Sequence, residues 1–174
     1  MEGWYYKTTD DNTSRFVLGT KGQKPIICFG INPSTAVPNE LDQTLRSVQR
    51  IALNNGYDSW IMLNVYPQRA TCPDELHEVV DMKIHRKNLS HIERLIETIC
   101  PLTIWAAWGT LIEKRKYLQE CLSDIVELTS KYDCSWVSFG NITKKGHPHH
   151  PLFVGQFQAP DDFNIKDYLA MGNR

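Results

Sequence analysis

The sequence predicts an α/β fold: a three-layer α/β/α sandwich with a mainly parallel four-stranded core sheet. One observation is a set of short apolar runs without polar alternation, at 25–31, 58–67, 102–108 and 134–139. The other is that segments with helical spacing of apolar residues separate these runs. Buried strands that alternate with helices favour right-handed crossovers and parallel neighbours.

The N-terminal part is predicted to form an edge hairpin. Residues 1–10 and 15–20 have the composition of short strands, and the turn-forming residues 10–12 lie between them. The first buried strand, at 25–31, then leads into the polar, proline-fixed loop Asn32-Pro33-Ser34-Thr35-Ala36. This passage from a buried strand to a polar turn is typical of a functional loop in an open sheet.

The middle of the chain predicts two helices and two more strands. Leu41, Leu45, Val48 and Ala52 form an apolar stripe, and the helix ends at 54–56. After it we expect the strand 58–67, then a helix over 84–99 that Pro101 ends, and then the strand 102–108. A further helix is expected from about residue 111 to 131, before the strand 134–139. The C-terminal segment carries no clear pattern, and no element is predicted there.

Length and cysteine content predict one soluble domain over residues 1–174. The five cysteines are odd in number and contain no Cys-x-x-Cys pair, which argues against a disulfide framework and a zinc ribbon. The apolar runs are shorter than the roughly 20 residues of a membrane helix, and residues 1–10 lack the pattern of a signal peptide. We therefore expect a cytoplasmic protein without a membrane partner; the sequence does not predict its oligomeric state.

The charge balance argues against tight, nonspecific binding of duplex nucleic acid. The formal net charge is −1, from 19 basic and 20 acidic residues. Nonspecific duplex binding depends on many contacts between cations and phosphates. A small or single-stranded substrate fits this composition better than a long duplex.

Four polar loops, each after a predicted strand, are expected to converge at one sheet edge. They contain Asn32 to Ala36, then Arg69 and Thr71, then Trp108 and Gly109, and finally Lys144 to Pro151. The alternative for each loop alone is ordinary turn chemistry, because these residue types are common in turns. Convergence of all four predicts a binding site.

Several residues in these loops have two interpretations. Ser34 lacks the Gly-x-Ser-x-Gly pattern of a nucleophile, so Ser34 or Thr35 is expected to cap a turn or to bind phosphate. Asp42 and Thr44 open the first helix; Asp42 either interacts with the helix dipole or serves as a base or ribose acceptor. Asn64, inside a buried strand, either organises the core or points into the site.

The late histidines predict hydrogen bonding and no metal site. Pro148 separates His147 from His149 and His150, and no cysteine or carboxylate lies within the segment to complete a ligand set. We expect these histidines to act as hydrogen-bond donors near a pocket, with a surface turn as the alternative. No cofactor is predicted. Asn88, on a helix among charged neighbours, is expected to be exposed.

These motifs together resemble an uncharacterised bacterial and phage family of unknown function. The shared features are the Asn-Pro-Ser-Thr-Ala turn, Asp42-x-Thr44, Asn64 with Arg69-Ala70-Thr71, Trp108-Gly109 and the segment 146–152. The resemblance covers residues near 25 to 155. Where its members often have Asn-Asp, this sequence has Asn88-Leu89.

A more distant resemblance is to the mismatch-specific branch of the uracil-DNA glycosylase superfamily. Gly30-Ile31-Asn32-Pro33 is similar to its first motif, and Trp108-Gly109 and the late His-Pro segment are similar to later motifs in the same order. The resemblance implies a parallel-sheet α/β/α fold and a nucleobase pocket, with water positioned by Asn32 and the late loop near phosphate or base. Ser34 replaces a glycine of that branch, and the late loop is longer.

The resulting hypothesis is a glycosylase-like enzyme acting on an N-glycosidic or related bond of a nucleotide or nucleic acid. The expected catalytic residues are Asn32, Asp42, His147 and His150. The expected substrate-binding residues are Ser34, Thr35, Thr44, Asn64, Tyr66, Arg69, Thr71, Trp108, Gly109 and Lys144. The alternatives are a noncatalytic nucleotide-binding module and a metal-dependent phosphoester hydrolase on the same loops.

Overall fold

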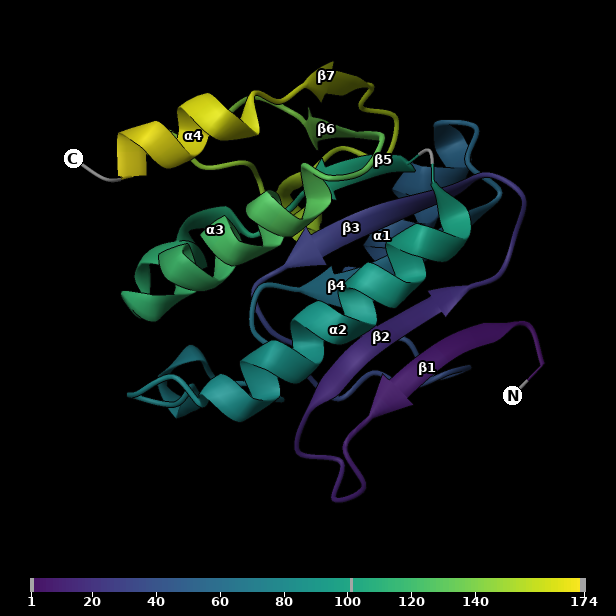
Figure 1. Ribbon diagram of the computed structural model, residues 1–174. Helices are drawn as coiled ribbons and strands as arrows, with labels where there is room; N and C mark the ends of the chain where they lie inside the picture. The colour runs from purple at the N-terminus through teal and green to yellow at the C-terminus, as the bar shows by residue number, and fades with distance from the viewer. Residues whose placement is uncertain (1, 101, 173–174) are drawn as a thin grey trace.

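The protein is an α/β molecule built on one mixed sheet (Figure 1). A computed structural model describes residues 2–100 and 102–172, and in them it contains seven strands and four α-helices. The strands are β1 (Trp4–Thr8), β2 (Arg15–Thr20), β3 (Pro25–Gly30), β4 (Ser59–Asn64), β5 (Leu102–Ala106), β6 (Cys134–Phe139) and β7 (Pro160–Asp162). The helices are α1 (Gln43–Asn54), α2 (Met82–Ile99), α3 (Tyr117–Thr129) and α4 (Ile165–Gly172). The predicted α/β class is confirmed.

The strands lie in the order β1-β2-β4-β3-β5-β6-β7. The neighbours β4, β3, β5 and β6 pair in parallel. β1 and β2 form the predicted antiparallel edge hairpin, and β2 runs antiparallel to β4. At the other edge β7 pairs antiparallel with β6, which no sequence pattern predicted. The sheet in the described residues is therefore wider than the predicted one, and mixed.

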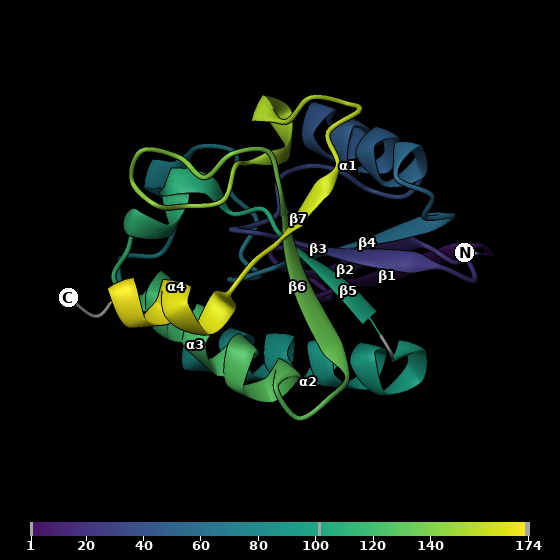
Figure 2. The ribbon, with the colours of Figure 1, turned by 90° about the horizontal axis from the view of Figure 1, so that it is seen from above.

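Helices cover both faces of the sheet (Figure 2). α1 lies on one face, and α2, α3 and α4 lie on the other. Alternate residues of β3 follow this division: Ile26 and Cys28 pack in the cluster with α1, whereas Ile27 and Phe29 pack in the cluster with α2 and α3. Both faces of the central strands are thus buried, which explains their continuous apolar sequence.

Three details differ from the predictions. The helix expected from residue 111 begins at Tyr117, because Gly109–Glu113 forms a separate 3₁₀ turn whose first residue has φ +63°. Asn88, expected to be exposed, is buried, because its Nδ2 donates to the Asn64 carbonyl at 2.9 Å. The segment without a predicted element forms the 3₁₀ turn Pro151–Phe153, β7 and α4. Pro101, predicted to end a helix, lies outside the described residues; α2 itself ends at Ile99.

Among the described residues, no helix combines the length and apolar character required to cross a bilayer.

Candidate functional site

The central strands bring their carboxyl ends to one edge of the sheet. Gly30 pairs with Asn64 in the parallel register, and Phe29 pairs with Ala106. β2 runs in the opposite direction, so its first residue reaches the same edge: the Arg15 amide donates to the Pro67 carbonyl at 3.0 Å. The loops after the strands and the start of β2 therefore meet there.

A cavity of about 70 Å³ lies at this edge. Its predicted site residues are Asn32, Ser34, Asp42, Thr44, Trp108 and His150. Its other lining residues are Arg15, Gly30, Ile31, Leu45, Met62 and Leu111. The β3–α1 connection, the loop after β6 and the start of β2 thus contribute polar groups to one small space.

Burial distinguishes two ends of this cavity. We call the buried lining residues the floor; they are Arg15, Gly30, Ile31, Leu45, Met62 and Trp108. We call the half-buried polar residues together with Leu111, which is 37% exposed, the mouth; the polar ones are Asn32, Ser34, Asp42, Thr44 and His150. The candidate catalytic groups in the cavity therefore lie at its mouth.

Asn32 is held rigidly at the mouth. Its Nδ2 donates to the carbonyls of Ala70, at 2.8 Å, and Pro33, at 3.1 Å. Both amide protons are used in this way. The Oδ1 atom therefore remains as the hydrogen-bond acceptor that this side chain can offer to a water molecule or a substrate.

Asp42 and His150 complement this acceptor. Asp42 is the N-cap of α1 and accepts the Leu45 amide at 2.9 Å. The His150 Nδ1 accepts the Leu152 amide at 3.3 Å, which assigns the ring proton to Nε2 in the neutral form. Burial lowers the pKa of His150, and the nearby Asp42 charge opposes this effect. His150 is thus a neutral donor at the mouth.

Two guanidinium groups converge behind the Asn32 loop. Arg15 Nη1 donates to the Ala36 carbonyl at 3.0 Å, and Arg69 Nη1 approaches the same oxygen at 3.4 Å. Arg69 also donates to the Ser34 carbonyl and, at 3.1 Å, to the Tyr6 hydroxyl. Arg15 is only 2% exposed; burial, and then the Arg69 charge, lower its pKa to about 10. Sequence reasoning missed Arg15, although a cation that opens an apolar strand was a signal.

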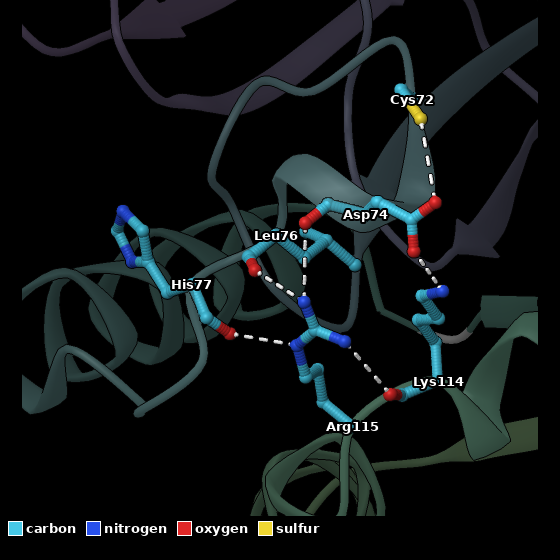
Figure 3. A network of polar contacts seen from close by, with 6 residues as sticks. All are labelled: Cys72, Asp74, Leu76, His77, Lys114 and Arg115. Atoms are coloured by element: carbon cyan, nitrogen blue, oxygen red, sulfur yellow. Dashed lines mark hydrogen bonds and ion pairs between the residues drawn. The ribbon is translucent and has the colours of Figure 1, made fainter.

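Arg115 fixes the segment 74–77, which follows Arg69 and Thr71 along the chain (Figure 3). Arg115 Nε donates to the His77 carbonyl at 3.1 Å, and Nη2 donates to the carbonyls of Asp74 and Leu76 at 3.1 and 3.0 Å. Lys114 adds an ion pair with the Asp74 carboxylate. These contacts attach this segment to the start of α3.

Other predicted residues border the cavity without lining it. The Thr71 hydroxyl lies 3.2 Å from the Ser34 hydroxyl, so it orders the mouth. A Cβ atom on Gly109 would approach the His150 Cβ at 3.3 Å, so this glycine gives the late loop its space. Thr35 and Lys144 are exposed and lie outside the lining.

Tyr66 is placed on the opposite face of the sheet. Its hydroxyl accepts the Asp81 amide at 2.9 Å and lies 2.8 Å from His77 Nδ1. Its ring packs 5.0 Å from that of Tyr117, and burial raises its pKa. The structure therefore does not bring the Tyr66 ring to the cavity.

His147 belongs to a separate polar chain. The Trp108 indole donates to the Tyr168 hydroxyl at 2.9 Å, which in turn lies 2.7 Å from His147 Nδ1. His147 Nε2 lies 3.0 Å from Glu113 Oε1. Because the indole is only a donor, Tyr168 donates to Nδ1, and Nε2–H donates to Glu113. This chain borders a cavity of about 700 Å³ beside α3 and α4, which does not include Asn32.

Asn64 lies beside the floor with an unpaired side chain. It is 1% exposed, and neither its Nδ2 nor its Oδ1 has a partner among the described residues. A Cβ atom on Gly30 would lie 3.3 Å from that Oδ1 and only 2.5 Å from Met62 Cε. A side chain at position 30 would therefore displace the Met62 methyl group from the floor.

In residues 2–100 and 102–172, no group of three or more His, Cys, Asp or Glu side chains is arranged to hold a metal ion.

The fold and site define an α/β protein with a polar cavity at the carboxyl edge of its central parallel strands. The chain belongs to the family described as Protein of unknown function (DUF1643), whose model matches residues 15–152. This match begins at Arg15 and includes every residue that lines the cavity. No curated protein and no solved structure matches the chain. The resemblance to uracil-DNA glycosylases gains no support from these comparisons.

Proposed function

We propose that this protein binds a nucleobase-containing substrate at the cavity and hydrolyses an N-glycosidic or related bond. The observation that carries the proposal is that Asn32 and Asp42, at the two ends of the β3–α1 connection, and His150, in the loop after β6, line one small cavity. An acceptor, a carboxylate and a neutral donor are the groups needed to position water, take its proton and assist a leaving base.

Each group has a role that its hydrogen bonds support. The Asn32 Oδ1 atom orients the attacking water, because its amide nitrogen is already committed to two carbonyls. Asp42 takes the proton from that water. Its carboxylate can do so because the helix-capping bond from the Leu45 amide uses only part of its acceptor capacity. The His150 Nε2–H donates to the departing base, where negative charge develops.

The size of the cavity limits where the base binds. Ligand pockets for drug-sized molecules occupy roughly 300–1,000 Å³, whereas this cavity measures about 70 Å³. The base therefore binds over the mouth, beside Leu111 and His150. The Trp108 ring packs 6.0 Å from that of Trp136 and 5.5 Å from that of Tyr168, so it supports the floor and does not stack on substrate.

The test is release of free base. Oligonucleotides containing deoxyuridine, inosine or a mismatch, and free nucleotides, are incubated with the protein, and released base is quantified by chromatography. We expect release from at least one substrate and its loss in Asn32→Ala. Binding without release would instead identify a noncatalytic nucleotide-binding module.

Matched variants separate chemistry from folding. Asn141→Ala removes an exposed amide and serves as the control for Asn32→Ala. His149→Gln is the control for His150→Gln, because His149 neighbours it but does not line the cavity. Equal base release in Asn32→Ala and Asn141→Ala would remove Asn32 from the mechanism.

A further inference from the structure

The floor of the cavity contains a buried positive charge that forms no ion pair within residues 2–100 and 102–172, although the Asp42 charge acts on it from the mouth. Arg15 is 2% exposed and lines the cavity, and its Nε has no hydrogen-bond partner among the described residues. Among the described residues, its side chain donates one hydrogen bond, to the Ala36 carbonyl. A buried charge that is not paired is costly, so such a group is expected to have a partner of opposite charge.

A second cation increases this imbalance. Arg69 approaches the same Ala36 oxygen as Arg15, and its Nε is also buried without a partner among the described residues. Asp42, in the same cavity, supplies one negative charge, and His150 is neutral. Two guanidinium groups and one carboxylate leave one positive charge in excess.

Two further features are consistent with an oxyanion at this position. Ser34 and Thr44 place hydroxyl groups in the lining, and hydroxyls donate to phosphate oxygens. A water needs roughly 10–15 Å³ of such space, so about 70 Å³ holds a group larger than one water and smaller than a heterocycle. The tetrahedral phosphate group has this intermediate size.

We propose that the cavity floor is an oxyanion site, in which Arg15, assisted by Arg69, binds the phosphate group of the substrate. The assignment of the anion to a substrate rests on the proposed function, because a nucleotide then places its phosphate on the floor and its sugar and base at the mouth. The glycosidic bond would lie near Asn32, Asp42 and His150. The substrate class is therefore a nucleoside monophosphate or a terminal phosphate of a nucleic acid, in preference to a free nucleoside.

The experiment measures thermal unfolding of the full chain with increasing inorganic phosphate, at constant ionic strength set with chloride. We expect Tm to rise by about 2–4 °C at roughly five times the dissociation constant. Arg15→Met should lose this rise, whereas Arg86→Met, which removes an exposed arginine on α2, should retain it. No rise in the wild type, or an equal rise in Arg15→Met, would overturn the oxyanion site.

A second variant keeps the test decisive if Arg15→Met does not fold. Asp42→Asn removes the one carboxylate from the cavity and retains an N-cap residue, so phosphate should bind more tightly and raise Tm more than in the wild type. An unchanged rise in Asp42→Asn would contradict the charge balance on which the site depends.

Parallel titrations distinguish this inference from the proposed function. A nucleoside 5′-monophosphate should raise Tm, and the matching nucleoside should have a smaller effect. A phosphate-dependent rise without base release from any substrate would retain the oxyanion site and reject the hydrolase. Base release without any phosphate-dependent rise in Tm would retain the hydrolase and reject the oxyanion site.

Discussion

Two polar regions near the carboxyl edge differ in how their hydrogen-bonding groups are used. In the chain of Trp108, Tyr168, His147 and Glu113, each donor faces an acceptor in a single consistent direction. In the small cavity, Arg15 Nε has no partner among the described residues, although Arg15 is buried.

This difference in hydrogen bonding indicates that the polar chain stabilises the fold, whereas the small cavity has groups that can bind a ligand. The chain of Trp108, Tyr168, His147 and Glu113 stabilises the packing of the late loop against α4, because each of its donors already has an acceptor. Buried groups with unused capacity lower stability unless something binds them. His147 and His150 are three residues apart, yet the first belongs to the satisfied chain and the second to the cavity.

The largest expected effect is on activity. Asp42→Asn should reduce base release about 10²- to 10⁴-fold, the usual contribution of a general base. Stability should be retained, because asparagine is also a good N-cap. Steady-state kinetics and thermal unfolding measure the two effects, with Asp161→Asn, an exposed carboxylate of β7, as the control. Full activity in Asp42→Asn would assign this carboxylate to helix capping alone.

A substitution in the polar chain of Trp108, Tyr168, His147 and Glu113 should lower stability and leave base release unchanged. Tyr168→Phe leaves the buried Trp108 indole and His147 Nδ1 without their shared partner, at about 1–3 kcal/mol for an unpaired buried group. Urea unfolding measures this loss. Tyr57→Phe, which removes a hydroxyl outside the chain, should change stability little. A larger loss of base release than of stability would instead assign Tyr168 to the substrate site and contradict its purely structural role.

Gly30→Ala tests the packing of the floor. The new Cβ would lie 2.5 Å from Met62 Cε, the far end of a flexible side chain, so the Met62 methyl group must move. Overpacking that such a side chain can relieve costs about 1 kcal/mol. Gly155→Ala is the matched control, because nothing lies within 4 Å of its Cβ position. Equal stability of the two variants by urea unfolding would show that the packing of Met62 against position 30 leaves room for a methyl group.

The smallest effect concerns pH. Burial lowers the pKa of His150 below its ordinary value of 6.5, so the folded protein binds its proton less readily than the unfolded chain. The associated stability is complete above pH 6.5 and is lost as the pH falls through the folded pKa. Unfolding curves should show a smaller loss across this range in His150→Gln than in His149→Gln. The same loss in both variants would indicate that His150 is not buried.

Sequence reasoning located the mouth of the cavity better than its floor. Asn32, Asp42 and His150 follow or flank buried strands, and parallel strands place such loops at one edge. Arg15 was missed because β2 runs antiparallel, so its first residue, and not its last, reaches that edge. Strand direction depends on long-range pairing that no local pattern records.

The direction of individual side chains was the second feature that the sequence did not predict. Tyr66 and Asn64 are two residues apart near the end of one strand, yet Tyr66 faces α2 while the Asn64 side chain lies beside Gly30. Strict alternation places such residues on one face, but it stops where β4 ends at Asn64. The loop then turns the Tyr66 ring toward His77 and Tyr117. Loop conformation of this kind is set by contacts distant in sequence.

A crystal structure with a bound nucleoside 5′-monophosphate would test the central claim most directly. We expect the phosphate to lie against Arg15 at the floor, and the glycosidic bond to lie at the mouth between Asn32, Asp42 and His150. A nucleotide bound instead in the larger cavity beside α3 and α4, with the small cavity unchanged, would contradict it.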